Sequence, residues 1–161
     1  MTERTLILLR HAKSDWSGHE ADIDRPLAER GRRQAPDTGR WLAANIDSVD
    51  LAVVSPARRA RRTWDLVSAE IDHRPRTRID DRVYAASSQE LLEVVRDLSD
   101  ELVTVVMVGH NPGLEDLVSL LTGESARMPT SALAVITLSG GWPTAGHAPG
   151  VLRASGRPRG T

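Results

Sequence analysis

The sequence predicts an α/β fold in which a mainly parallel sheet forms the centre of one domain. Short apolar runs of strand length alternate with longer segments of helical character, and this alternation is typical of parallel sheets with right-handed crossovers. The length of 161 residues and the composition, 40% hydrophobic and 27% charged, suit one globular domain with a buried core. No repeat or linker divides the sequence, so we expect a single domain over residues 1–161.

Five short segments are expected to form strands. Residues 5–9 and 51–54 are nearly continuous apolar runs, and residues 102–108 give the strongest strand signal in the chain. Such runs are typical of strands that are buried on both faces of a parallel sheet. Residues 132–138 have the same character, and residues 151–152 are expected to form a last strand at an edge of the sheet.

Four segments between these strands are expected to be helical. The first covers residues 26–45, although a proline and two glycines lower the helix propensity inside it. The second covers residues 56–71. The third begins at Ser87, where Ser-Ser-Gln-Glu has the pattern of a capping box, and the fourth follows Pro112.

The charge and the residue types exclude several classes of protein. A formal net charge of −1 argues against a chain built to coat nucleic acid or an acidic membrane, and the absence of cysteine excludes thiolate metal sites. No segment has the pattern of a signal peptide or a membrane span, so we expect a cytoplasmic protein. Residues 153–161 contain arginines and no acid, which indicates a flexible basic tail or a rim for an acidic partner.

Histidines and arginines follow three of the predicted strands. Arg10 and His11 come directly after the first strand, and His110 follows residues 102–108. The segment after the second strand contains four arginines: Arg58, Arg59, Arg61 and Arg62. Ligands of parallel α/β sheets bind beyond the carboxyl ends of the strands. Each signal is weak by itself, because a lone histidine is more often a packed or solvent-facing side chain. Their coincidence predicts one site.

Such a cluster suits phosphoryl transfer. Arginine guanidinium groups bind phosphate oxygens in pairs, and a neutral imidazole is a competent nucleophile. Phosphoryl transfer mainly requires positioning and neutralisation of the charge on the phosphoryl oxygens. No cluster of carboxylates follows the strands, so the arginines and the second histidine would replace a metal ion. We therefore expect neither a metal nor another cofactor.

Four stretches resemble motifs of the histidine phosphatase superfamily, also called phosphoglycerate mutase-like. They occur in the family's order between residue 6 and about residue 120: Leu9-Arg10-His11-Ala12-Lys13-Ser14-Asp15-Trp16, Asp24-Arg25-Pro26-Leu27 with Gly31 and Gln34-Ala35, Ser55-Pro56-x-x-Arg59-Ala60-x-x-Thr63, and Gly109-His110. The first resembles the Arg-His-Gly signature, with Ala12 in place of the glycine. We expect the alanine to be tolerated if its φ is not positive.

The resemblance implies a three-layer α/β/α fold of the phosphoglycerate mutase type and assigns roles to four residues. His11 would be the catalytic nucleophile that becomes phosphorylated, and His110 would be the second catalytic histidine. Arg10 and Arg59 would bind the phosphoryl oxygens. The remaining arginines of the second motif do not match the family, and we expect them to be exposed helix residues: Arg58, Arg61 and Arg62.

Within the superfamily, the short phosphohistidine phosphatases of the SixA type are the most similar. The chain lacks room for the insertions of the mutases, Asn111-Pro112-Gly113 follows His110, and residues 85–88, which follow Tyr84, include no acid. The imidazole of phosphohistidine needs less help to leave than an alkoxide, so a site without a general acid favours P–N substrates. Asp80, Glu90 and Glu115 are weaker candidates for an acid. The other possible acid or substrate contacts are Asp81, Lys13 and Ser14.

Three functions are therefore open, in order of preference. The first is a phosphatase that acts on phosphohistidine in a partner protein, and the second is a small-molecule phosphomonoesterase of the same superfamily. A mutase would need a more enclosed site. The third is a non-catalytic phosphate- or nucleic-acid-binding module built on residues 58–62 and the basic tail, although an aromatic content of 3% argues against base stacking. We expect no nucleic acid or membrane partner, and the oligomeric state is left open.

Overall fold

The structure, a computed structural model, describes residues 3–160, so residues 1–2 and 161 of the predicted domain lie outside the described part. The strands are β1 (Arg4–Arg10), β2 (Leu51–Val54), β3 (Arg76–Ile79), β4 (Thr104–Gly109), β5 (Leu133–Leu138) and β6 (Val151–Gly156). The α-helices are α1 (Glu29–Asn45), α2 (Arg58–Ser68), α3 (Ser88–Arg96) and α4 (Gly113–Thr122). Three short 3-10 helices complete the described elements: η1 (Asp22–Asp24), η2 (Asp81–Val83) and η3 (Trp142–Thr144).

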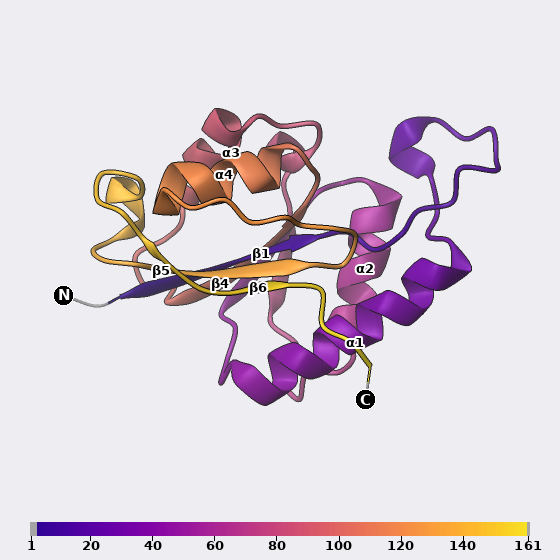
Figure 1. The fold of residues 1–161 in the computed structure, drawn as a ribbon, viewed down its shortest axis with the longest axis horizontal. Helices are drawn as coiled ribbons and strands as arrows, with labels where there is room; N and C mark the ends of the chain where they lie inside the picture. The colour runs from indigo at the N-terminus through magenta and orange to yellow at the C-terminus, as the bar shows by residue number, and fades with distance from the viewer. Residues whose placement is uncertain (1–2, 161) are drawn as a thin grey trace.

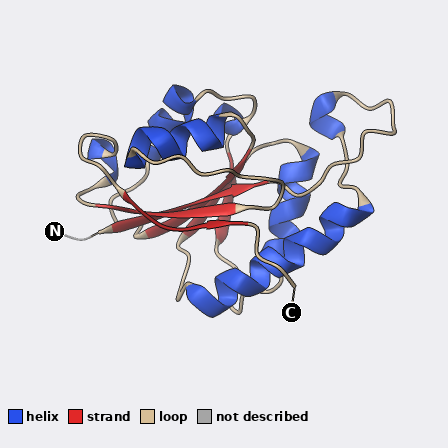
Figure 2. Cartoon of the chain, viewed as in Figure 1, coloured by secondary structure: helices blue, strands red, loops and turns tan. Residues whose placement is uncertain are grey.

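The strands form one six-stranded sheet in the order β3-β2-β4-β1-β5-β6. Neighbours are parallel from β3 to β1, whereas β5 pairs antiparallel with β1 and β6 pairs antiparallel with β5. Helices cover both faces of the sheet, which gives the predicted three-layer α/β/α arrangement (Figure 2). The predicted fold class is thus confirmed. Because β2, β4 and β1 are parallel neighbours, their carboxyl ends share one edge of the sheet.

Two hydrophobic clusters, one on each face of the sheet, form the core. Leu6 and Leu8 of β1 pack in one cluster with residues of α3 and α4, whereas Ile7 and Leu9 pack in the other with residues of α1 and α2. Helices α3 and α4 lie on the opposite side of the sheet from α1 (Figure 1). Successive side chains of a strand point to opposite faces, so a strand that is covered on both faces must be apolar at every position. This requirement explains the continuous apolar runs in the sequence.

Two edge elements differ from the sequence-based prediction. Strand β3 was not predicted, because its four residues, Arg-Thr-Arg-Ile, are all exposed and show no apolar run. Strand β6 extends four residues beyond the expected pair and ends at Gly156. Arg157 Nη1 then donates a hydrogen bond to the Thr130 carbonyl oxygen (3.3 Å). The flexibility of the tail stays a prediction.

The helices lie where the sequence predicts them, with small shifts at their ends. Helix α1 begins three residues later than expected and continues through Pro36. The capping box of α3 is confirmed: Ser87 Oγ accepts from the Glu90 N–H, and Glu90 Oε1 accepts from the Ser87 N–H. Within the described residues, no helix has the length and apolarity needed to cross a bilayer.

Helix α1 packs directly against the loop that follows β1. A Cβ atom added at Gly31 would lie 2.2 Å from the Lys13 carbonyl oxygen. The same oxygen accepts a hydrogen bond from the Ala28 N–H (2.9 Å). Glycine at position 31 therefore permits the close approach that fixes the loop two residues beyond His11.

Candidate active site

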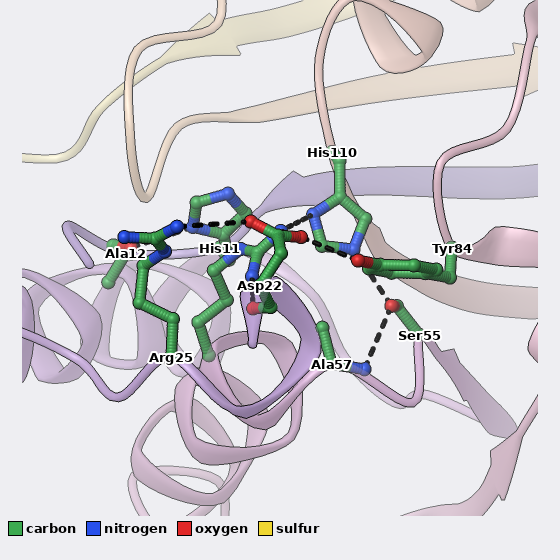
Figure 3. Close-up of polar contacts among 9 residues, drawn as sticks. His11, Ala12, Asp22, Arg25, Ser55, Ala57, Tyr84 and His110 are labelled. Carbon is green, nitrogen blue, oxygen red and sulfur yellow. Dashed lines mark hydrogen bonds and ion pairs between the residues drawn. The ribbon is translucent and has the colours of Figure 1, made fainter. Parts of the chain in front are cut away.

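The carboxyl ends of β1, β4 and β2 bring two histidines and one arginine together. His11 follows β1, His110 follows β4, and Arg59 lies in the first turn of α2, which follows β2. The ring centroids of the two histidines are 5.1 Å apart, and Arg59 Nη2 lies 3.5 Å from His110 Nδ1. Figure 3 shows the two imidazoles in one group of side chains, with the Asp22 carboxylate drawn between them in this view. Three side chains that are distant in the sequence thus converge as the strand-end rule predicts.

His11 is held with one ring nitrogen bonded and the other available. Its side chain is buried, and Nδ1 lies 2.8 Å from the Ala12 carbonyl oxygen. When Nδ1 carries the hydrogen it donates to that carbonyl, so Nε2 keeps a free lone pair. The Ala12 N–H donates to Thr63 Oγ1 of α2 (2.9 Å), which fixes the loop. Ala12 does not have a positive φ, so the condition on which alanine is expected to be tolerated there is met.

Both histidines are neutral at physiological pH. Burial lowers the pKa of His11 to about 3, and the charges of Arg59 and Arg10 act in the same direction. Burial also lowers the pKa of His110 to about 4, again with a contribution from the charge of Arg59. A neutral imidazole with a free lone pair is the form that can attack phosphorus.

The lowered pKa values predict a loss of stability in mild acid. The unfolded chain binds protons on its histidines near pH 6.5, whereas folded His11 stays neutral, so unfolding is favoured as the pH falls below 6.5. We expect this effect to lower the free energy of unfolding by roughly 1 kcal/mol per pH unit for His11. Urea unfolding at pH 7.0 and pH 5.0 measures it.

The matched variants are His11→Asn and His73→Asn, because His73 is exposed. His11→Asn should lose less stability than the wild type between the two pH values, and His73→Asn should behave as the wild type. An equal loss in all three proteins would contradict the assignment of this pH dependence to the buried histidine.

His110 is oriented by a serine and a tyrosine to which the sequence assigns no role. His110 Nε2 lies 2.8 Å from Ser55 Oγ, and Ser55 Oγ accepts from the Ala57 N–H (3.2 Å). The Tyr84 ring packs edge-on against His110, with centroids 5.6 Å apart. Because Arg59 donates toward His110 Nδ1, the hydrogen of the neutral ring belongs on Nε2, from which it is donated to Ser55.

Arg10 lies beside the histidines at the end of β1. Its Nη1 donates to the Met128 carbonyl oxygen (3.1 Å), and its buried Nε has no hydrogen-bond partner among residues 3–160. Its positive charge contributes to lowering the pKa of both histidines. Arg10 also lines a cavity of about 490 Å³ with Glu115, Arg127, Met128 and Pro129. The guanidinium therefore supplies positive charge to the site and borders open space.

Asp22, which the sequence analysis missed, contacts Arg59 with both its backbone and its side chain. The Asp22 carbonyl oxygen accepts from Arg59 Nη1 (2.7 Å), and Asp22 Oδ2 accepts from Arg59 Nη2 (3.0 Å). Tyr84 donates its hydroxyl hydrogen to the same Oδ2 (2.5 Å). The hydrogen bond from Tyr84, together with Arg59, lowers the pKa of Asp22 to about 2. An ionised carboxylate thus borders the cluster.

The segment that carries Asp22 also brings Arg25 and Trp16 to the rim of the site. The Arg25 guanidinium carbon lies 3.5 Å from the centroid of the exposed Trp16 ring, and Arg25 Nη2 lies 3.5 Å from Asp22 Oδ1. The matched stretch Asp24–Leu27 was a signal that this loop belongs to the site. It did not single out Asp22, because a loop has no periodicity from which the direction of a side chain follows.

The weaker candidates lie outside this set of contacts. Lys13 and Asp81 are exposed, and Ser14 is buried and pairs with Leu27 in an isolated β-bridge. Among residues 3–160, the side-chain contacts of His11, His110 and Arg59 involve none of these three. Their roles stay predictions. The three other arginines of α2 are exposed, as expected: Arg58, Arg61 and Arg62.

In the described part of the chain, no group of three or more histidine or acidic side chains is arranged to hold a metal ion. The site instead combines a neutral nucleophilic imidazole, a second imidazole, two guanidiniums and one carboxylate. This combination can bind a phosphoryl group through its oxygens and attack its phosphorus.

Comparisons with known proteins agree with this geometry. Residues 6–84 match the model of the histidine phosphatase superfamily, branch 1. An uncharacterised protein of Mycobacterium tuberculosis is 37% identical over 145 residues, which cover 83% of this chain and 89% of the relative. A candidate phosphohistidine phosphatase SixA from Nakamurella multipartitia has a TM-score of 0.87 and 27% identity, with 98% of each chain covered. A second candidate phosphohistidine phosphatase SixA, from Agrobacterium tumefaciens, has a TM-score of 0.83 and 28% identity. The match covers 96% of this chain and 98% of that chain.

Proposed function

Because this chain belongs to the histidine phosphatase superfamily, we propose that it is a metal-independent phosphatase that works through a phosphorylated His11. The observation that carries the proposal is the state of His11: buried, neutral and fixed through Nδ1, with Nε2 free. Arg59 and His110 lie close enough to contact a phosphoryl group on this nitrogen.

The reaction has two displacements. His11 Nε2 attacks phosphorus, and the bond to the leaving group breaks with its electron pair on that group. Arg10 and Arg59 bind the phosphoryl oxygens and stabilise their charge, which is the main demand of phosphoryl transfer. His110 joins them when its Nε2–H turns from Ser55 Oγ to a phosphoryl oxygen. Water then attacks the phosphorus of phospho-His11, releasing inorganic phosphate and restoring the imidazole.

The substrate class that fits best is phosphohistidine in a partner protein. The four residues after Tyr84 offer no acid, and the pKa of Asp22, lowered to about 2, leaves that carboxylate without a proton to donate at neutral pH. An alkoxide leaving group needs a general acid, whereas an imidazole does not. The likeness to SixA-type structures over almost the whole chain supports the same class.

Parallel assays with two kinds of substrate test this proposal. We expect the protein to dephosphorylate a histidine-phosphorylated carrier protein with a higher kcat/KM than it shows for sugar or nucleotide phosphates. Faster turnover of the phosphomonoesters would overturn the phosphohistidine version and favour a small-molecule phosphatase. Binding of phosphate or oligonucleotides without turnover of either substrate would overturn the enzymatic proposal.

A further inference from the structure

The site has a buried end and an open end. His11 is 7% exposed and Arg59 is 8% exposed, whereas the Asp22 side chain is 47% exposed. In an in-line displacement the leaving group lies on the opposite side of phosphorus from the nucleophile. Since the nucleophile proposed above is at the buried end, the leaving group must lie toward the open end. Asp22 borders that end.

The Asp22 carboxylate is held from three directions. It is joined by dashed contacts to Tyr84 and Arg25 in Figure 3, and Arg59 binds it from α2. Oδ2 accepts from both Tyr84 and Arg59, while Oδ1 has Arg25 Nη2 at 3.5 Å. A distance of 3.5 Å is at the long limit for a hydrogen bond. Oδ1 therefore retains the capacity to accept a hydrogen bond from a ligand.

An anion in a phosphate site needs an explanation, because it repels the phosphoryl group. A carboxylate without a proton is an acceptor only. It offers nothing to a departing alkoxide or phenolate, which is itself an acceptor. It does stabilise a leaving group that carries an N–H, and most of all one that is positively charged. A carboxylate in this position would thus discriminate between leaving groups by their charge and hydrogen-bonding capacity.

We propose that Asp22 determines the specificity for the leaving group by accepting a hydrogen bond from the ring N–H of a phosphorylated imidazole. This inference rests on the proposed function and deepens it. The hydrogen bond to Asp22 would favour P–N substrates directly, in addition to the effect of a missing general acid.

The step that this contact assists is balanced without a further reactant. The substrate imidazole carries phosphorus on one nitrogen and a proton on the other. The lone pair of His11 Nε2 forms the new P–N bond, and the electron pair of the old P–N bond returns to the substrate ring. The imidazolium leaves as a neutral imidazole that keeps its N–H. Asp22 raises the proton affinity of the bound ring and so increases the population of the reactive, protonated form.

The test compares two small substrates in the wild type and in Asp22→Asn. Phosphoimidazole has a nitrogen leaving group, and p-nitrophenyl phosphate has an oxygen leaving group that needs no acid. We expect Asp22→Asn to lower kcat/KM for phosphoimidazole by about 10-fold to 100-fold, the range for a lost hydrogen bond to a charged group. The kcat/KM for p-nitrophenyl phosphate should stay the same or rise. Glu20→Gln, a change at an exposed acid two residues before Asp22, should alter neither.

Two further readouts separate a leaving-group contact from mere positioning of Arg59. In Asp22→Asn, inorganic phosphate should inhibit several-fold more strongly, because a repelling charge is gone. As the pH is raised, the activity of Asp22→Asn toward phosphoimidazole should also begin to fall at a lower pH than the activity of the wild type. Equal losses with both substrates, or weaker inhibition by phosphate, would show that Asp22 only positions Arg59 and would overturn the inference.

The wild-type measurement tests the proposed function independently. A wild type that prefers p-nitrophenyl phosphate to phosphoimidazole would overturn the P–N substrate class whatever Asp22→Asn does. A wild type that prefers phosphoimidazole, combined with an unchanged preference in Asp22→Asn, would overturn the role of Asp22 alone.

Discussion

His11→Ala is expected to lower phosphatase activity by roughly 10⁴-fold or more, the scale on which enzymes lose activity when a covalent nucleophile is removed. His11 combines burial, neutrality and a free Nε2. His110 cannot take over without rearrangement, because its Nε2 is bonded to Ser55 Oγ. Rapid quench with a ³²P-labelled phosphodonor should trap an acid-labile, base-stable phosphate on the wild type, and mapping should place it on His11.

The label is the decisive part of this measurement, because activity alone also falls when a site is distorted. His11→Ala should show no trapped phosphate. His73→Ala, a change at an exposed histidine, should keep both the label and the activity of the wild type. Label that persists in His11→Ala, or that maps to His110, would contradict His11 as the nucleophile. It would also contradict the proposed direction of attack.

The strand pattern was sufficient to predict that the two histidines meet arginines of residues 58–62, for a simple physical reason, whereas the family resemblance singled out Arg59 among them. A strand covered by helices on both faces must be apolar throughout, so β1, β2 and β4 are visible as continuous runs. Parallel strands then place the residues that follow them at one edge of the sheet. By contrast, β3 lies at the other side of β2 with four exposed residues, and nothing in its sequence distinguishes it from a loop.

Asp22 marks the limit of prediction from sequence. It contacts Arg59 and Tyr84, which lie 37 and 62 residues away, from a loop whose path follows no periodic rule. The sequence analysis therefore described a site with an arginine pair and no nearby carboxylate. The structure adds the carboxylate but leaves the chemical expectation intact, since an acid with a pKa near 2 holds no proton at pH 7. A site can therefore contain a carboxylate and still lack a proton donor.

Arg59→Ala is expected to lower kcat by on the order of 10²–10³, the loss typical when one donor to a charged transition state is removed. Arg59 is buried at the start of α2 and points toward His110. Its charge helps to hold the pKa of His110 down to about 4, so the same change should raise that pKa. Steady-state kinetics measure the first effect, and an NMR pH titration of the histidine ring measures the second.

Arg62→Ala provides the matched control, because it removes the same charge from an exposed position on the same helix. If kcat responds to the net positive charge of α2, the two variants should lose similar activity. If it responds to a guanidinium that contacts the phosphoryl oxygens, only Arg59→Ala should lose it. Arg59→Lys distinguishes charge from geometry further, since lysine keeps the charge but not the planar pair of donors. Recovery of full activity by lysine would contradict a paired contact with phosphate and leave Arg59 as a source of charge alone.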